Sequence, residues 1–195
     1  KNLSRRKFLE GTAALTGGAL AASTAAGQTL LGLTPPQMEG PFFPINLPID
    51  QDNDLVRIQG LAKNAFGKVT HIGGRILNPE GKPIKGALME IWQCDHTGKY
   101  NHPGDRQPQE FDDHFQGYGK TITNENGEDR FRTIKPVSYP GRTPHIHFKV
   151  SAQGHDDLTR QMYIKGEFLN RFDGIFMNET PQDRARLVVD LQTAA

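Results

Sequence analysis

Residues 145–150, His-Ile-His-Phe-Lys-Val, most constrain the fold of this chain because apolar and polar side chains alternate along them. Successive side chains of a β-strand point to opposite faces, so this alternation predicts a strand with two unlike faces. Three residues lie on each face: Ile146, Phe148 and Val150 against His145, His147 and Lys149. His145 and His147 therefore point in the same direction, and a strand can present two adjacent ligands to a metal ion in this way.

The remainder of the chain has the pattern of short strands separated by turns. Turn signals rich in Gly, Pro and Asn occur at 78–81, 124–127 and 139–141. The predicted strands are 69–77, 87–93, 117–123, 130–134, 146–150 and 187–191. One brief helix is predicted to begin at Thr180-Pro181. Strands of this length and spacing predict a mostly β, single-domain β-sandwich with few short helices.

The first 27 residues have the features of a twin-arginine export signal. Ser4-Arg5-Arg6-Lys7 is followed by a weakly apolar run rich in Ala and Gly at 11–27, which ends in small residues. This run falls short of the roughly 20 strongly apolar residues that a membrane span requires. We therefore expect 1–27 to be a signal peptide and 28–195 to be one domain, exported to the periplasm or the extracellular space and not inserted in the membrane.

Charge and cysteine content exclude some classes of protein. The chain has a formal net charge of +1, and its signal segment contributes +3, which leaves about −2 for the remainder. A near-neutral domain without a basic patch is not expected to bind nucleic acid. Cys94 is the single cysteine, so no intrachain disulfide can form and packing has to supply the stability. The sequence does not decide between a monomer and an oligomer.

Several motifs accompany the histidine pair in a fixed order. They are Trp92-Gln93, Gly98-Lys99-Tyr100, Thr133-Ile134-Lys135-Pro136 and Tyr139-Pro140, with Arg142 shortly before the histidines. Together these motifs resemble those of the intradiol ring-cleavage dioxygenases. The resemblance runs from about Glu39 to Tyr163, which is most of the chain between its two ends. It implies an intradiol dioxygenase-like β-sandwich with a catalytic metal.

The resemblance also implies specific roles. A mononuclear, non-haem Fe(III) would be bound by four residues: Tyr100, Tyr139, His145 and His147. The implied enzyme uses O2 to cleave a small catechol-type substrate between its two hydroxyl-bearing carbons. Tyr139 matches the tyrosinate that leaves the iron to take a proton from the substrate. Arg142 matches the arginine that stabilises negative charge on the ring, and Gln161 is a weaker candidate near the site.

The types of donor atom favour iron independently of the resemblance. Fe(III) is a hard Lewis acid that draws the proton from a phenol, and the phenolate in turn stabilises the ferric state. Zinc sites use His, Cys and carboxylates and seldom recruit tyrosine. A ferrous site with two histidines and one carboxylate needs an Asp or Glu, and a cupin-like site would need a Glu where this chain has Ser151.

Two other functions stay open at this point. Residues 81–87, Gly-Lys-Pro-Ile-Lys-Gly-Ala, resemble repeats of transthyretin-like binding modules, whose fold can exist without a metal. His145 and His147 could instead hold zinc in a hydrolase with an unidentified third ligand. The substrate is not predicted, because the residues that would recognise a ring substituent lie outside the motifs. The family's longer insert between Tyr139 and His145 is absent, which predicts a wider pocket mouth.

Overall fold

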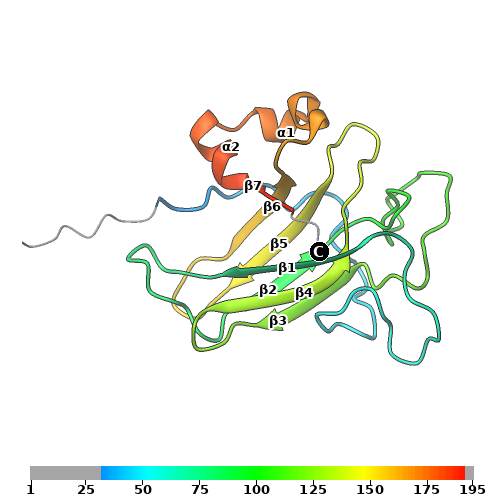
Figure 1. The fold of residues 1–195 in the computed structure, drawn as a ribbon, viewed down its shortest axis with the longest axis horizontal. Helices are drawn as coiled ribbons and strands as arrows, with labels where there is room; N and C mark the ends of the chain where they lie inside the picture. Colours follow the sequence, from blue (N-terminus) through cyan, green and yellow to red (C-terminus); the bar gives the residue numbers. More distant parts are fainter. Residues whose placement is uncertain (1–31, 192–195) are drawn as a thin grey trace, which may run out of the picture.

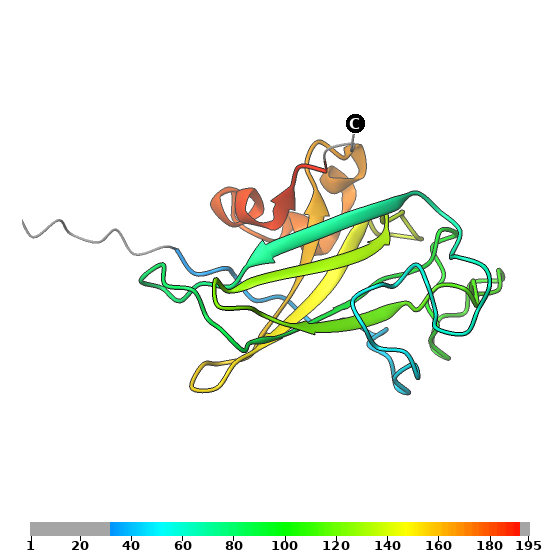
Figure 2. The ribbon, with the colours of Figure 1, turned by 60° about the horizontal axis from the view of Figure 1, so that its bottom comes forward.

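The computed structural model describes residues 32–191, which form two β-sheets (Figures 1 and 2). The smaller sheet has the order β1-β4 and the larger has the order β3-β2-β5-β6-β7. The strands are β1 Val69–Arg75, β2 Leu88–Trp92, β3 Tyr118–Ile122, β4 Glu128–Ile134, β5 His145–Ser151, β6 Leu158–Ile164 and β7 Val188–Val189. The predicted mostly β architecture is confirmed. The predicted signal peptide lies outside the described residues.

Three short helices follow β6 and lie near the β6–β7 edge of the larger sheet (Figure 1). They are the 3-10 helix η1 Phe168–Phe172 and the α-helices α1 Gly174–Met177 and α2 Pro181–Leu187. Thr180 caps α2 by accepting a hydrogen bond from the backbone N–H of Asp183, and Pro181 occupies the first turn. The predicted helix start is therefore confirmed. Within residues 32–191, no helix is long and apolar enough to span a membrane.

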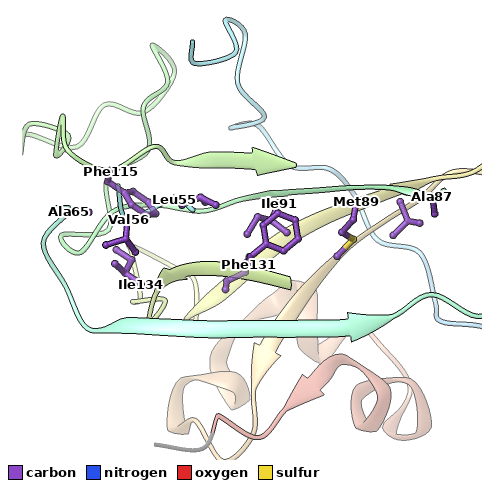
Figure 3. Close-up of a cluster of buried hydrophobic side chains, with 11 residues drawn as sticks. Leu55, Val56, Ala65, Ala87, Met89, Ile91, Phe115, Phe131 and Ile134 are labelled. Carbon is purple, nitrogen blue, oxygen red and sulfur yellow. The ribbon is translucent and has the colours of Figure 1, made fainter. Parts of the chain in front are cut away.

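The hydrophobic core lies between the two sheets (Figure 3). Ile91 from β2 and Phe131 from β4 meet in its centre and are almost fully buried. Ile146 and Val150 of β5 belong to the same cluster, and Phe148 packs against it. The predicted apolar face of β5 is therefore confirmed, and burying it stabilises the sandwich through the hydrophobic effect.

Most of the predicted strands occur, but two predictions need correction. β6 was missed because its centre carries Arg160 and Gln161, which hide the apolar pattern although both side chains are buried. The strand predicted at 187–191 is reduced to β7, because Leu187 completes α2. β6 matters for the site, since it pairs with β5 and sets Gln161 opposite His147.

Candidate metal centre

β5 holds the two predicted histidine ligands on the face that points away from the core. His145 and His147 are 1% and 2% exposed, and their Nε2 atoms lie 3.1 Å apart. The Nδ1 of His145 lies 2.7 Å from the carbonyl oxygen of Thr143. A carbonyl can only accept, so Nδ1 carries the proton and Nε2 of the neutral ring keeps its lone pair. Two imidazole nitrogens thus converge on one point.

Two neighbouring residues restrict the His147 ring. Trp92 of β2 stacks on it with a centroid distance of 4.9 Å and an angle of 11° between the rings. On another side Gly40 has a φ of +83°, and a Cβ there would stand 3.2 Å from the His147 Cε1. Glycine permits both this backbone conformation and this close approach. The imidazole is therefore fixed by packing.

The two predicted tyrosine ligands come from loops and meet the histidines. The ring centroids of Tyr100 and Tyr139 are 5.4 Å apart. Tyr139 lies 5.5 Å from His145, and Tyr100 lies 6.2 Å from His147. The Tyr100 hydroxyl is buried and has no hydrogen-bond partner among the described residues. Burying a polar group without a hydrogen-bond partner costs free energy, so a bound metal ion would stabilise this hydroxyl by supplying a partner.

Burial sets the charge state of all four side chains. It lowers the pKa of His145 to about 4, with the Arg142 guanidinium adding to the effect, and it lowers the pKa of His147 well below its ordinary value. Both imidazoles are therefore neutral and able to bind a metal. Burial raises the pKa of Tyr100 and Tyr139, so both phenols keep their protons until a cation displaces them.

The donor set fits a ferric ion better than zinc. Within residues 32–191, no group of three or more His, Cys, Asp or Glu side chains is arranged to hold a metal. The phenols of Tyr100 and Tyr139 lie beside the histidine pair and can supply further donors. Phenolate is a hard donor that suits Fe(III), whereas zinc sites are built from His, Cys and carboxylates.

Arg142 lies beside Tyr139, and several side chains fix its guanidinium. Its Nε donates to Asp173 at 2.8 Å, one terminal nitrogen donates to Gln161, and the other lies 3.3 Å from the Tyr139 hydroxyl. Gln161 also accepts a hydrogen bond from Tyr163 at 3.0 Å. The sequence-predicted residues Arg142 and Gln161 are thus in direct contact. Together they bring a fixed positive charge to the edge of the donor set.

Asp173 was not predicted from the sequence. It is 1% exposed and caps α1 by accepting from the backbone N–H groups of Ile175 and Phe176. Its other oxygen accepts from Arg142 Nε and from the backbone N–H of Thr143. An Asp ahead of a short helix could have been predicted as its N-cap. No sequence pattern predicts its contact with an arginine 31 residues earlier.

Asp105 is a second residue that the sequence did not reveal. Its carboxylate accepts from the backbone N–H of Tyr100 at 2.8 Å and of Gln107 at 3.0 Å. Lys99 Nζ donates to the Asp105 carbonyl oxygen at 2.7 Å. These contacts close the loop around Tyr100, so Asp105 fixes the backbone of this predicted ligand.

The chain is similar to known dioxygenases. The model of the Dioxygenase_C family, described as dioxygenase, matches residues 38–195. The chain is 34% identical over 145 residues to the protocatechuate 3,4-dioxygenase beta chain of Burkholderia cepacia, covering 70% of this chain and 62% of that one. It is 31% identical over 156 residues to catechol 1,2-dioxygenase of Acinetobacter baylyi, covering 69% of this chain and 47% of that one.

The chain also matches one solved structure over most of that structure's length. The dioxygenase domain of a dioxygenase carbohydrate-binding protein fusion from Streptomyces sp. SirexAA-E superposes with a TM-score of 0.65 at 33% identity, covering 83% of this chain and 90% of that domain. The chain belongs to the intradiol ring-cleavage dioxygenase family. It spans less than two thirds of the length of the two curated relatives described above.

Proposed function

We propose that this chain is a non-haem ferric dioxygenase that opens a catechol-type ring between its two hydroxyl-bearing carbons with O2. One observation carries the proposal: two neutral imidazoles and two phenols meet in one site, buried except at Tyr139, with the Nε2 atoms of His145 and His147 3.1 Å apart. The matched relatives are named for protocatechuate and catechol, which supports a catechol-type substrate.

The four ring residues would hold the metal. His145 and His147 supply Nε2 donors, and Tyr100 and Tyr139 supply phenolate oxygens. A ferric ion held in this way would supply a Lewis acid that acidifies the hydroxyls of a catechol and makes its ring reactive toward O2. The protein has to exclude bulk water and move protons around this ion.

The two tyrosines differ in ways that support different roles. Tyr100 is 3% exposed, and its backbone is bound to Asp105, so it is fixed. Tyr139 is half-buried and borders a cavity. A catechol that binds through both oxygens has to lose two protons. The Tyr139 oxygen is the ligand that can move away and accept one of them.

Arg142 would stabilise the negative charge that develops on the substrate ring. A guanidinium stays charged even where it is largely buried. Asp173 and Gln161 hold it in place before the substrate arrives, so little reorganisation is needed. The role of Gln161 is therefore to orient the guanidinium.

The reaction can be tested with labelled oxygen. Catechol, protocatechuate and hydroxyquinol would be offered to the purified protein under ¹⁸O2, and the products analysed by mass spectrometry. We expect a ring-opened dicarboxylate that carries both labelled atoms, with no reductant consumed. Product without label, or turnover that requires NADH, would exclude intradiol cleavage.

We also propose that the chain is exported by the twin-arginine route to the periplasm or the extracellular space. The support is the order of Arg5-Arg6, a weakly apolar run and small residues in 1–27. The double variant Arg5→Lys/Arg6→Lys should remain in the cytoplasm with its activity intact. Fractionation that finds the variant exported at the normal level would reject this route.

A further inference from the structure

A cavity of about 440 Å³ lies beside the proposed catalytic arginine. Tyr139 and Arg142 line it together with Leu169 and Phe172 of η1. Ligand pockets commonly measure roughly 300–1,000 Å³ and accept drug-sized molecules. A simple catechol is one small ring. The cavity therefore has room for more than the ring that would bind next to Arg142.

Phe172 gives this cavity an exposed aromatic wall. Its side chain is 65% exposed, and its ring lies 5.4 Å from that of Phe168, which is 59% exposed. A single exposed apolar residue needs no explanation, but Phe172 lines the cavity with a second aromatic ring beside it, and it offers a surface that another ring can stack on. The next residue, Asp173, accepts a hydrogen bond from Arg142, so Phe172 is adjacent in the chain to the residue that holds the guanidinium.

Gly141, in the turn between Tyr139 and Arg142, also lines the cavity. Gly141 has a φ of +80°, and a Cβ built there would meet no heavy atom within 4 Å. The backbone N–H of Arg142 donates to the Tyr139 carbonyl oxygen at 2.9 Å, which keeps this turn compact. Arg142 and Phe172 line the same cavity, so a substituent on a ring held beside Arg142 would have room to extend toward Phe172.

We infer that Leu169 and Phe172 form a subsite for a second ring, and that the substrate class is catechols with an aryl substituent. This inference rests on the proposed function, because it assigns the substrate of the same site. The subsite would discriminate through binding: Phe172 would stack on the substituent and Leu169 would contact its edge. The second ring would add apolar burial and an aromatic contact to the interactions that catechol alone can make.

The test compares catechol with 4-phenylcatechol. For the iron-containing wild type, we expect kcat/KM to be about tenfold higher for 4-phenylcatechol, mainly through KM. In Phe172→Ala the ratio of the two kcat/KM values should fall by about tenfold, and in Phe172→Tyr it should be retained. Phe66→Ala is the matched control, because Phe66 is 60% exposed but does not line the cavity.

A ratio that is unchanged in Phe172→Ala, or that falls equally in Phe66→Ala, overturns the subsite. Cleavage of catechol with no preference for 4-phenylcatechol rejects the inference and leaves the proposed function standing. If neither compound is cleaved, the proposed function fails, and titration calorimetry without O2 decides the subsite separately. There, tighter binding of 4-phenylcatechol that depends on Phe172 supports it, and equal binding of the two compounds rejects it.

Discussion

Replacement of Asp173 by alanine should destabilise the protein more than any loss of an exposed charge could. The Asp173 carboxylate accepts four hydrogen bonds of 2.8–3.0 Å: from Arg142 Nε and from the backbone N–H groups of Thr143, Ile175 and Phe176. Its side chain is fully buried, and that of Arg142 is only 14% exposed. One residue thus joins the β5 side of the site to α1.

Two losses set the size of the effect. Removing a helix cap costs about 1 kcal/mol. Removing one partner of a buried ion pair costs about 3–5 kcal/mol, because the other charge stays buried, and the partial exposure of Arg142 argues for the lower end. We therefore expect Asp173→Ala to lower the free energy of unfolding by about 4 kcal/mol. Asp173→Asn should lose about 3 kcal/mol, since asparagine is an equally good cap and only the loss of the ion pair remains.

Equilibrium urea unfolding of preparations with equal metal content measures these differences. With a slope near 2 kcal/mol per molar urea, the midpoint of Asp173→Ala should fall by about 2 M at an unchanged slope. Replacing the exposed Asp190, which is paired with Lys165 at 3.8 Å, by alanine is the control and should change the midpoint little. A loss below about 1 kcal/mol for Asp173→Ala would refute the proposed role of the carboxylate.

Three further outcomes are expected. Arg142→Ala should keep its iron while kcat falls by about 10²–10³-fold, since this side chain stabilises charge and binds no metal; loss of iron would contradict this. Asp105→Asn should reduce the iron content at equal protein, because it loosens the backbone of Tyr100; full iron content would contradict this. Burial raises the pKa of Asp173, but hydrogen bonds from Phe176, Thr143 and Arg142 outweigh burial and lower it overall. A lowered folded-state pKa contributes stability above the unfolded value of about 3.9 that is lost as pH falls through the folded value. Wild type should therefore lose its stability advantage over Asp173→Asn below about pH 4 in acid titrations, and a constant difference would contradict this.

The sequence predicted those parts of the fold whose cause is local. The alternation in β5 and the Asn-Gly turn before β4 depend on neighbouring residues, and both occur as expected. β6 could not be predicted in the same way. Arg160 and Gln161 are polar residues, which a sequence pattern places on the surface. Tertiary contacts explain their burial: Arg160, for example, donates to the Arg186 carbonyl oxygen at 2.9 Å.

The same distinction between local and tertiary causes applies to the residues of the site. His145 and His147 share a face for a reason that lies within one strand, so their convergence was predictable. Their meeting with Tyr100 was expected only from the family resemblance, because a loop brings that residue to the site. Asp173 was not predicted because its partner Arg142 is distant in the sequence, and the spacing of residues does not predict contacts at such a distance.

The visible absorption spectrum of the purified protein, recorded with its metal content, tests the ferric bis-tyrosinate site most directly. Phenolate bound to Fe(III) gives a charge-transfer band that zinc cannot produce. We expect a reddish protein with about one iron per chain, and a weaker, shifted band in both Tyr100→Phe and Tyr139→Phe. A colourless protein that contains zinc, or a band unchanged by both substitutions, would contradict the assignment of Tyr100 and Tyr139 as ligands.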